Sequence, residues 1–274
     1  MEHLTRRQVL TGGAAALGAL ARGRWAGAQA APATAGPADP KLIEDLVAAN
    51  RILVDQGVVD GYGHVSVRHD KAADRYLMSR SIAPELVTAA DIMEYDLDSV
   101  PVDPRGRATY LERFIHGEIY RIRPDVRAIV HNHSPSVIPF GATGAQLRPL
   151  YHMSAFLWPV VPVFEIRSAG GPGTDMLVRN PALGQALART LGAGPVALMR
   201  GHGAVVVAGN LPEAVFRSVY TEVNARLQTQ AMALGGPVTY LDTEEAKKAQ
   251  ASLAGTIPRP WELWKRKALT AGPK

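Results

Sequence analysis

The chain of 274 residues contains no cysteine. Disulfide bonds and thiolate metal sites are therefore excluded, and any metal ion must be bound by His, Asp or Glu. Aromatic residues make up only 6% of the chain and charged residues 20%, whereas hydrophobic residues reach 47%. This balance is too apolar for a disordered chain and is typical of a globular protein.

Residues 1–30 have the layout of a bacterial export signal. They contain a twin arginine, Arg6 and Arg7, a weakly apolar stretch and an Ala-Gln-Ala cleavage site that ends at Ala30. A basic amphipathic helix is the alternative interpretation. We therefore expect the twin-arginine (Tat) export machinery as a partner and a periplasmic or secreted mature protein. No other stretch reaches the roughly 18 apolar residues that a membrane-spanning helix needs, so no membrane contact is expected after cleavage.

Little net charge remains once this segment is removed. Its four arginines and one glutamate account for +3 of the formal net charge of +5, which leaves +2 for residues 31–274. The basic residues are also scattered along the chain rather than clustered. We therefore expect no nucleic-acid partner.

Beyond the signal, a Pro/Ala linker at residues 31–40 precedes alternating strand-like and helix-like segments. Helices are predicted at 41–57, 109–122, 181–192 and 213–235. Strands are predicted at 62–69, 75–79, 92–97, 126–133 and 160–166, with two more within 196–209. No repeat or internal boundary follows the linker, so the pattern predicts one α/β domain, residues 41–254, with helices packed on a sheet.

A basic C-terminal tail, residues 255–274, follows this domain. It carries Trp261 and Trp264 in a segment bounded by prolines. These aromatic side chains either dock on a neighbouring subunit, cover a site, or cover the core of their own chain.

Two histidines lie at the end of the predicted strand at residues 126–133. Because strand residues alternate between the two faces of a sheet, His131 and His133 project to the same side. Neutral imidazoles at this spacing can bind a divalent metal, although two hydrogen-bonded histidines at a strand end are the alternative. His202, flanked by glycines, is a third candidate ligand, or else it belongs to a tight turn with no further role.

The helix predicted from Thr109 begins with a carboxylate that has two interpretations. Thr109 and Glu112 match the capping-box pattern, in which the glutamate only returns a hydrogen bond to the start of the helix. Alternatively, Glu112 lies near the histidines as a metal ligand or general base. His116, one turn later on the same helix face, either contacts such a site from behind or packs in the core.

Taken together, these residues resemble the class II aldolase/adducin family. In that family a glutamate opens a helix, an H-x-H follows on the next strand, and a third histidine lies in an H-G turn before the last long helix. Here these residues are Glu112, then His131 and His133, then His202. The segments HGEIYRIRPDVRAIVHNHS and GYGHVSVR are also similar to family sequences. The resemblance covers residues 41–235.

The resemblance implies a fold, a metal site and an assembly. The fold is a single three-layer α/β/α domain with a central mixed, mainly antiparallel sheet. His131, His133 and His202 would hold a divalent metal such as zinc, manganese or cobalt, with Glu112 as acid/base and fourth ligand. The metal would act as a Lewis acid when a carbon–carbon bond breaks. Family members tend to form tetramers, so we expect a homo-oligomer.

The sequence departs from the sugar-phosphate members of this family at their phosphate-binding positions. Two serines before the glutamate are replaced by Tyr110 and Leu111, and an asparagine is replaced by His64. The phosphate loop is replaced by Met-Ser-Arg-Ser at residues 78–81. A sugar phosphate would lose most of its hydrogen-bond donors here, which favours a small anionic substrate without a phosphate.

Several side chains are candidates for binding such a substrate. They are His64, Ser79, Arg80, Ser81, Tyr151 and His152. The planar guanidinium of Arg80 suits a carboxylate, unless it forms a surface ion pair. Tyr151 and His152 are candidate proton donors or carboxylate contacts if their segment lines the pocket, and packing residues if it does not.

The segments YLMSRSIAPELVTAADI, YLERFIHGEIY and SPSVIPFG resemble one branch of the family in particular. That branch includes metal-dependent decarboxylases of hydroxylated aromatic or pyridine carboxylates. We therefore predict a metal-dependent carbon–carbon lyase that decarboxylates a related acid. One alternative is an aldolase for a small, non-phosphorylated carbonyl substrate. The other is a non-catalytic, adducin-like binding module, which the complete set of metal-binding residues disfavours.

Overall fold

The computed structural model describes residues 32–270, so the predicted export signal at residues 1–30 lies outside the described residues. The α-helices are α1 (Pro40–Asp55), α2 (Phe114–Ile122), α3 (Ile138–Ala142), α4 (Arg167–Gly170), α5 (Pro181–Leu191), α6 (Leu211–Ala233), α7 (Thr243–Ala254) and α8 (Pro258–Thr270). The strands are β1 (His64–Arg68), β2 (Arg75–Ser79), β3 (Ile92–Asp96), β4 (Ala128–Asn132), β5 (Val163–Phe164), β6 (Val196–Met199) and β7 (Gly203–Ala208).

The seven strands form one sheet in the order β3-β2-β1-β4-β7-β6-β5. All neighbouring pairs are antiparallel except β5 and β6, which confirms the expected mixed, mainly antiparallel sheet. In the centre of the sheet, His64 of β1 lies opposite His131 of β4, and Asn132 of β4 lies opposite Ala204 of β7. This register brings three of the segments with candidate site residues to one end of the sheet.

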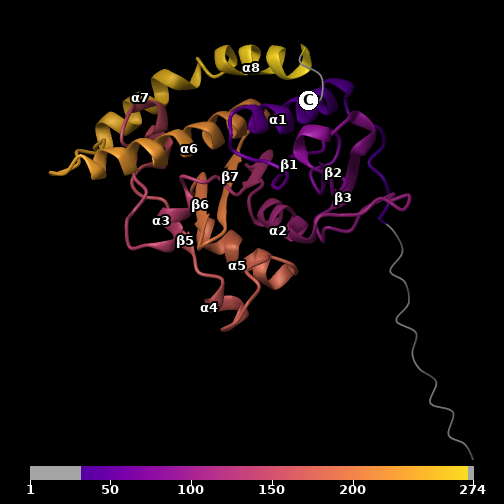
Figure 1. Ribbon diagram of the computed structural model, residues 1–274. Helices are drawn as coiled ribbons and strands as arrows, with labels where there is room; N and C mark the ends of the chain where they lie inside the picture. The colour runs from indigo at the N-terminus through magenta and orange to yellow at the C-terminus, as the bar shows by residue number, and fades with distance from the viewer. Residues whose placement is uncertain (1–31, 271–274) are drawn as a thin grey trace, which may run out of the picture. The chain divides into compact units, whose positions relative to one another are not determined.

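Helices cover both faces of the sheet, as the three-layer prediction requires (Figure 1). Helices α1, α6 and α8 lie on one face, and α2 and α5 lie on the other. Successive residues of a strand point to opposite faces. Accordingly, Val130 of β4 packs in the core beneath α1 and α6, and its neighbour Ile129 packs in the core beneath α2 and α5. Within residues 32–270, no helix combines the length and the apolar character that crossing a membrane requires.

The start of α2 differs from the sequence prediction. The helix expected from Thr109 begins only at Phe114, after a 3-10 turn at Leu111–Arg113. Tyr110 occupies the cap position and makes no side-chain capping bond, and Glu112 has a non-helical backbone with φ −92° and ψ 18°. The capping-box interpretation of Glu112 is therefore wrong, and its carboxylate is available for other contacts.

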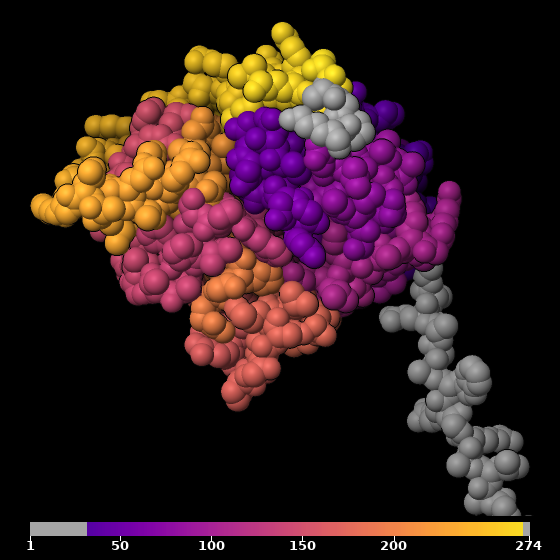
Figure 2. Space-filling model, viewed as in Figure 1, coloured from indigo at the N-terminus to yellow at the C-terminus, as the bar shows by residue number. Residues whose placement is uncertain are grey.

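The C-terminal segment folds back onto the domain as α8. Figure 2 shows this yellow helix lying directly against the indigo segment that contains α1. Trp261 and Trp264 are only 7% and 9% exposed, and both belong to the core beneath α1 and α6. The ring of Trp264 also packs near that of Tyr220 in α6. Of the alternatives for these tryptophans, they therefore cover the core of their own chain.

Replacing Trp264 with alanine should destabilise the folded chain. The change removes a buried indole from the contact of α8 with α1 and α6, which typically costs about 3–5 kcal/mol. Leu263→Ala on the same helix is the matched control, because Leu263 is 58% exposed, and its effect should stay within about 0.5 kcal/mol. Equal denaturation midpoints for the two variants in urea would contradict the packing of α8.

Candidate metal centre

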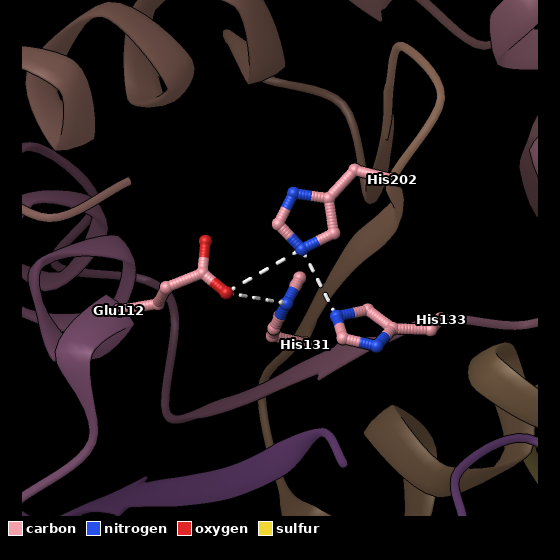
Figure 3. A group of neighbouring side chains, drawn as sticks. All are labelled: Glu112, His131, His133 and His202. Atoms are coloured by element: carbon pink, nitrogen blue, oxygen red, sulfur yellow. Dashed lines mark hydrogen bonds and ion pairs between the residues drawn. The ribbon is translucent and has the colours of Figure 1, made fainter. Parts of the chain in front are cut away.

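Four side chains from separate segments converge at one end of the sheet (Figure 3). Glu112 comes from the 3-10 turn before α2, His131 from β4, His133 from just beyond β4, and His202 from the turn between β6 and β7. One potential ligand atom from each residue lies within 4.8 Å of the other three. The strand period placed His131 and His133 on one side, and the sheet order brings the turn with His202 beside them.

The shortest distances in this group join the imidazole nitrogens and one carboxylate oxygen. The Nε2 atoms of His133 and His202 are 2.9 Å apart. Oε2 of Glu112 lies 3.4 Å from Nε2 of His202 and 3.5 Å from Nε2 of His131. The other oxygen, Oε1, accepts a hydrogen bond of 2.9 Å from the backbone N–H of Val178, which fixes the orientation of the carboxylate.

Backbone carbonyl groups determine which nitrogen of two histidines carries the proton. A carbonyl oxygen only accepts hydrogen bonds, so Nδ1–H of His131 donates to Ala204 O at 3.2 Å and Nδ1–H of His202 donates to Met176 O at 2.9 Å. In the neutral imidazoles the lone pair is then on Nε2, which faces the centre of the group. A carbonyl that orients a histidine in this way is the usual support of a metal ligand.

The arrangement fits a divalent cation. Two Nε2 lone pairs at 2.9 Å repel each other unless a proton or a cation lies between them. Within the described part of the chain, Nε2 of His131 is buried without a hydrogen-bond partner, since its contact with Glu112 is too long for a normal hydrogen bond. Three imidazoles and one carboxylate, without sulfur, are ligands that zinc, manganese and cobalt accept.

The charges in this group are strongly coupled. Burial opposes ionisation of Glu112, but the adjacent His131 and His202 outweigh it and hold the pKa of the carboxyl well below its usual range. For His202, burial is likewise outweighed, by Glu112 and the Met176 carbonyl, so its pKa is raised. Burial, together with the charges of His131 and His202, lowers the pKa of His133 to about 4. Glu112 is therefore ionised at neutral pH, and His133 offers a free lone pair.

Gly203 allows the turn with His202 to approach β4. A Cβ atom at this position would lie 2.0 Å from the carbonyl oxygen of Asn132, far inside contact distance. A glycine is therefore required where the backbones of the two ligand-bearing segments meet.

A cavity of about 490 Å³ opens beside the four residues. Its wall includes Glu112, His131 and His133 together with side chains that are mostly aromatic or aliphatic. These side chains are Tyr62, Ile82, Tyr110, Leu111 and Leu177. Over the described residues, no lysine or arginine lines the cavity.

Three of the six predicted substrate-binding residues lie at or directly behind this cavity wall. His64 and Ser81 line it. Ser79 is buried behind the wall, where its hydroxyl is hydrogen-bonded to the hydroxyl of Tyr110 at 3.0 Å. Tyr110 also donates to the carbonyl of Ile82, so these bonds hold two parts of the wall together.

The other three predicted residues do not line the cavity. Arg80 donates from Nε to Asp91 at 2.6 Å, so the surface ion pair, the alternative interpretation of this residue, is what the structure contains. Tyr151 is half-buried outside the cavity, with its pKa raised by burial, and His152 is exposed. Within one chain, none of the three is positioned to bind a substrate next to the histidines.

The predicted role of His116 behind the site has a structural basis. Its Nε2 lies 2.6 Å from Nδ1 of His64 in the cavity wall, and its Nδ1 lies 2.6 Å from the hydroxyl of Ser66. Sequence reasoning missed Ser66 and also Tyr120, whose hydroxyl lies 2.9 Å from that of Ser66. A signal for Tyr120 was present in the sequence, because it follows His116 by four residues and so lies on the same face of α2.

Residues 44–229 match the family described as the Class II Aldolase and Adducin N-terminal domain. The chain belongs to the class II aldolase/adducin family. The match confirms the resemblance that the spacing of Glu112 and the three histidines indicated.

The similar proteins include decarboxylases and an aldolase. Decarboxylase tropJ of Talaromyces stipitatus is 38% identical over 252 residues, which cover 84% of this chain and 95% of that protein. The 3,4-dihydroxyphthalate decarboxylase of Arthrobacter keyseri is 32% identical over 205 residues, or 70% of this chain and 79% of that protein. L-fuculose 1-phosphate aldolase from Glaciozyma antarctica PI12 superposes with a TM-score of 0.70 at 23% identity, over 85% of this chain and 92% of that chain. The family member described here is thus related to aromatic decarboxylases and has the aldolase fold.

Replacing His131 with alanine should remove divalent metal from the protein. The change deletes the buried nitrogen that has no other partner, so three ligands remain and the affinity falls. Metal content after dialysis, measured by elemental analysis, checks this result. His152→Ala is the matched control, because His152 is exposed and away from the cavity. Full metal content in His131→Ala would rule out this centre.

Gly203→Ala should lower both metal affinity and the free energy of unfolding. A methyl group against Asn132 O forces the turn with His202 away from β4, and such overpacking typically costs about 1–3 kcal/mol. Gly255→Ala is the control, since Gly255 has φ −74° and nothing within 4 Å of an added Cβ. If both variants bound zinc like the wild type, the close approach at Gly203 would not matter for the site.

Proposed function

We propose that this family member is a divalent-metal-dependent carbon–carbon lyase that decarboxylates a hydroxylated aromatic acid. The observation that carries the proposal is the group of Glu112 and three histidines at the end of a cavity with an aromatic and aliphatic wall. A flat ring can pack against Tyr110 and Leu111 while its oxygen atoms face the histidines. The similarity to tropJ supports decarboxylation, and the similarity to 3,4-dihydroxyphthalate decarboxylase supports this substrate class.

His131, His133 and His202 would hold the metal, and Glu112 would be a fourth ligand until the substrate binds. When bound, the cation supplies Lewis acidity to the oxygen atoms of the substrate and stabilises the negative charge that develops as carbon dioxide leaves. The carbonyl groups of Ala204 and Met176 keep two of the histidines oriented without the substrate. The chain thus prepares the site before the reaction begins.

Glu112 is the residue that we propose to move the proton. Among the described residues it is the only carboxyl group that lines the cavity, and its low pKa means that it starts as a carboxylate. It accepts the proton of the substrate's ring hydroxyl through Oε2, while Oε1 stays bonded to Val178 N–H. After the bond to the carboxylate breaks, the electron pair remains on the ring carbon. Glu112 then returns its proton to that carbon, and water reprotonates the ring oxygen as the product leaves.

The aldolase alternative uses the same residues. The likeness to L-fuculose 1-phosphate aldolase, at 23% identity, supports the fold but not a sugar-phosphate substrate. The cavity wall has no arginine or lysine within residues 32–270 that would bind a phosphate. Decarboxylation is therefore the better-supported proposal, and cleavage of a small carbonyl compound is the second.

Export through the twin-arginine route and assembly into a homo-oligomer remain predictions. The first rests on residues 1–30, and the second on the tendency of the family. Mass photometry of the mature chain, and fractionation of cells that express the full chain, are the direct measurements.

Wild-type protein reconstituted with manganese, zinc or cobalt should release carbon dioxide from one or more ortho-hydroxy aromatic acids. Glu112→Gln should retain the fold and most of the metal but lose between about a hundredfold and ten-thousandfold in kcat, because an amide cannot transfer the proton. Glu262→Gln, an exposed position on α8, is the matched control and should keep full activity.

Carbon dioxide release without metal, or undiminished in Glu112→Gln, would contradict this mechanism. No release from any acid of the panel by metal-loaded protein would favour the aldolase alternative, which an assay for aldehyde release from small hydroxy-carbonyl compounds then tests.

A further inference from the structure

A row of buried polar side chains leads away from the cavity behind His64. Nδ1 of His64 lies 2.6 Å from Nε2 of His116. The other ring nitrogen of His116, Nδ1, lies 2.6 Å from Oγ of Ser66. The hydroxyl oxygen of Tyr120 lies 2.9 Å from the same Oγ. All four side chains are at most 4% exposed. His64 and Ser66 lie two residues apart on β1 and so point to the same face, and His116 and Tyr120 are one turn apart on α2. The mechanism above uses none of them.

The far end of this row determines the direction of its hydrogen bonds. The hydroxyl of Tyr120 has two acceptors within reach, Ser66 Oγ at 2.9 Å and the carbonyl of Arg127 at 3.4 Å. The first distance is that of a normal hydrogen bond, whereas the second is beyond the usual range for a hydroxyl donor. The contact with Ser66 is the shorter of the two, and we take Tyr120 as its donor.

The remaining donors follow from this first bond. Since Ser66 Oγ accepts from Tyr120, its own proton goes to Nδ1 of His116. His116, buried and neutral, then carries its proton on Nε2 and donates it to Nδ1 of His64. A neutral His64 that accepts at Nδ1 must carry its proton on Nε2.

Nε2 is the ring nitrogen of His64 that is not engaged by His116, and His64 is part of the cavity wall. In the described part of the chain, no group hydrogen-bonds to this nitrogen, although His64 lines the cavity next to Tyr110 and His131. The ring centroids of His64 and His131 are 5.0 Å apart, so a molecule at the histidine group also reaches His64. Because arginine and lysine are absent from the described cavity wall, an N–H here is one of few donors for an anionic oxygen.

We propose that Tyr120, Ser66 and His116 hold His64 in the tautomer with its proton on Nε2, and that this N–H donates a hydrogen bond to an anionic oxygen of the substrate. His64 is then a specificity-determining residue that selects an acid over a neutral compound, and the three residues behind it are positioning residues. The substrate class rests on the proposed function. The tautomer does not depend on it.

The tautomer is tested by nuclear magnetic resonance on zinc-loaded protein that contains ¹⁵N-labelled histidine. Long-range ¹H–¹⁵N correlations distinguish a protonated from an unprotonated ring nitrogen, and His64→Gln assigns the signals of His64 by their loss. We expect Nε2 of His64 to be protonated and Nδ1 unprotonated. The reverse pattern would overturn the proposal.

Substitutions behind His64 test the positioning residues in the same spectrum. Ser66→Ala should shift His64 towards a mixture of tautomers, because His116 loses the donor at its Nδ1. Tyr120→Phe should have a smaller effect of the same kind. The matched controls are Ser218→Ala, whose hydroxyl bonds only within α6, and Tyr95→Phe, whose hydroxyl contacts Met93. An unchanged His64 in Ser66→Ala, or equal shifts in the controls, would refute the role of the chain.

The hydrogen bond to the substrate is tested by binding of salicylate to cobalt-loaded protein, followed by the visible absorption of the metal. His64→Leu should weaken binding about tenfold to a hundredfold, as expected for a hydrogen bond to a charged acceptor. His64→Gln, which restores an N–H near the position of Nε2, should recover most of this loss. Cobalt content is measured in each variant, so that a loss of metal is not mistaken for a loss of donor.

These results separate the two proposals. If no acid is decarboxylated but salicylate affinity follows the order wild type, Gln, Leu, the proposed function fails and this inference stands. If carbon dioxide is released but His64→Leu binds salicylate like the wild type, the function stands and the inference fails. Absence of salicylate binding to the wild type would also overturn the hydrogen bond.

Discussion

The site depends on a buried nitrogen, Nε2 of His131, that no group in the described part of the chain satisfies, and on the close approach of other ligand atoms beside it. Three imidazoles and a carboxylate are held within 4.8 Å of one another, and Nε2 of His131 has no hydrogen-bond partner among the described residues. A buried polar atom without a hydrogen-bond partner destabilises the folded chain, because it has lost its hydrogen bonds to water. A divalent cation supplies that partner for all four groups at once, and the surrounding structure is organised around this requirement.

Backbone atoms provide most of the organisation. The carbonyl groups of Ala204 and Met176 orient two histidines, and the N–H of Val178 orients Glu112. Backbone groups are positioned by the sheet and its turns, so the ligands do not depend on flexible side chains for their orientation. Glu112 belongs to the same arrangement, because its non-helical backbone does not cap the helix and its carboxylate lies against His131 and His202 instead.

The cavity next to this group has a mostly apolar wall with little charge. Its described wall offers one carboxylate, aromatic and aliphatic side chains, and no fixed positive charge. The anionic substrate that we propose would then be held by a metal and by neutral donors, of which His64 is the one that we propose to be oriented by other residues. Neutral donors in a buried wall discriminate between substrates because an unsatisfied N–H costs more than a lost contact.

Much of this protein is determined by local sequence. The two-residue period of β4 predicts that His131 and His133 share one side, and the spacing of Glu112 and the histidines identifies the family. The order of helices and strands predicts an α/β domain, because each element has to bury its apolar face. These conclusions need no knowledge of distant contacts.

Other features are decided only by the tertiary structure. Arg80 lies in a segment where the family resemblance predicts a substrate contact, yet Asp91, 11 residues later, forms an ion pair with it outside the cavity. The tautomer that we propose for His64 depends on Tyr120, which is 56 positions away in the sequence and contacts Ser66 of β1 from α2. The sequence allows three roles for Trp261 and Trp264, and only the packing of α8 on α1 shows that they cover the core of their own chain. Local patterns determine which groups are available, and the packing of distant segments determines which of them meet.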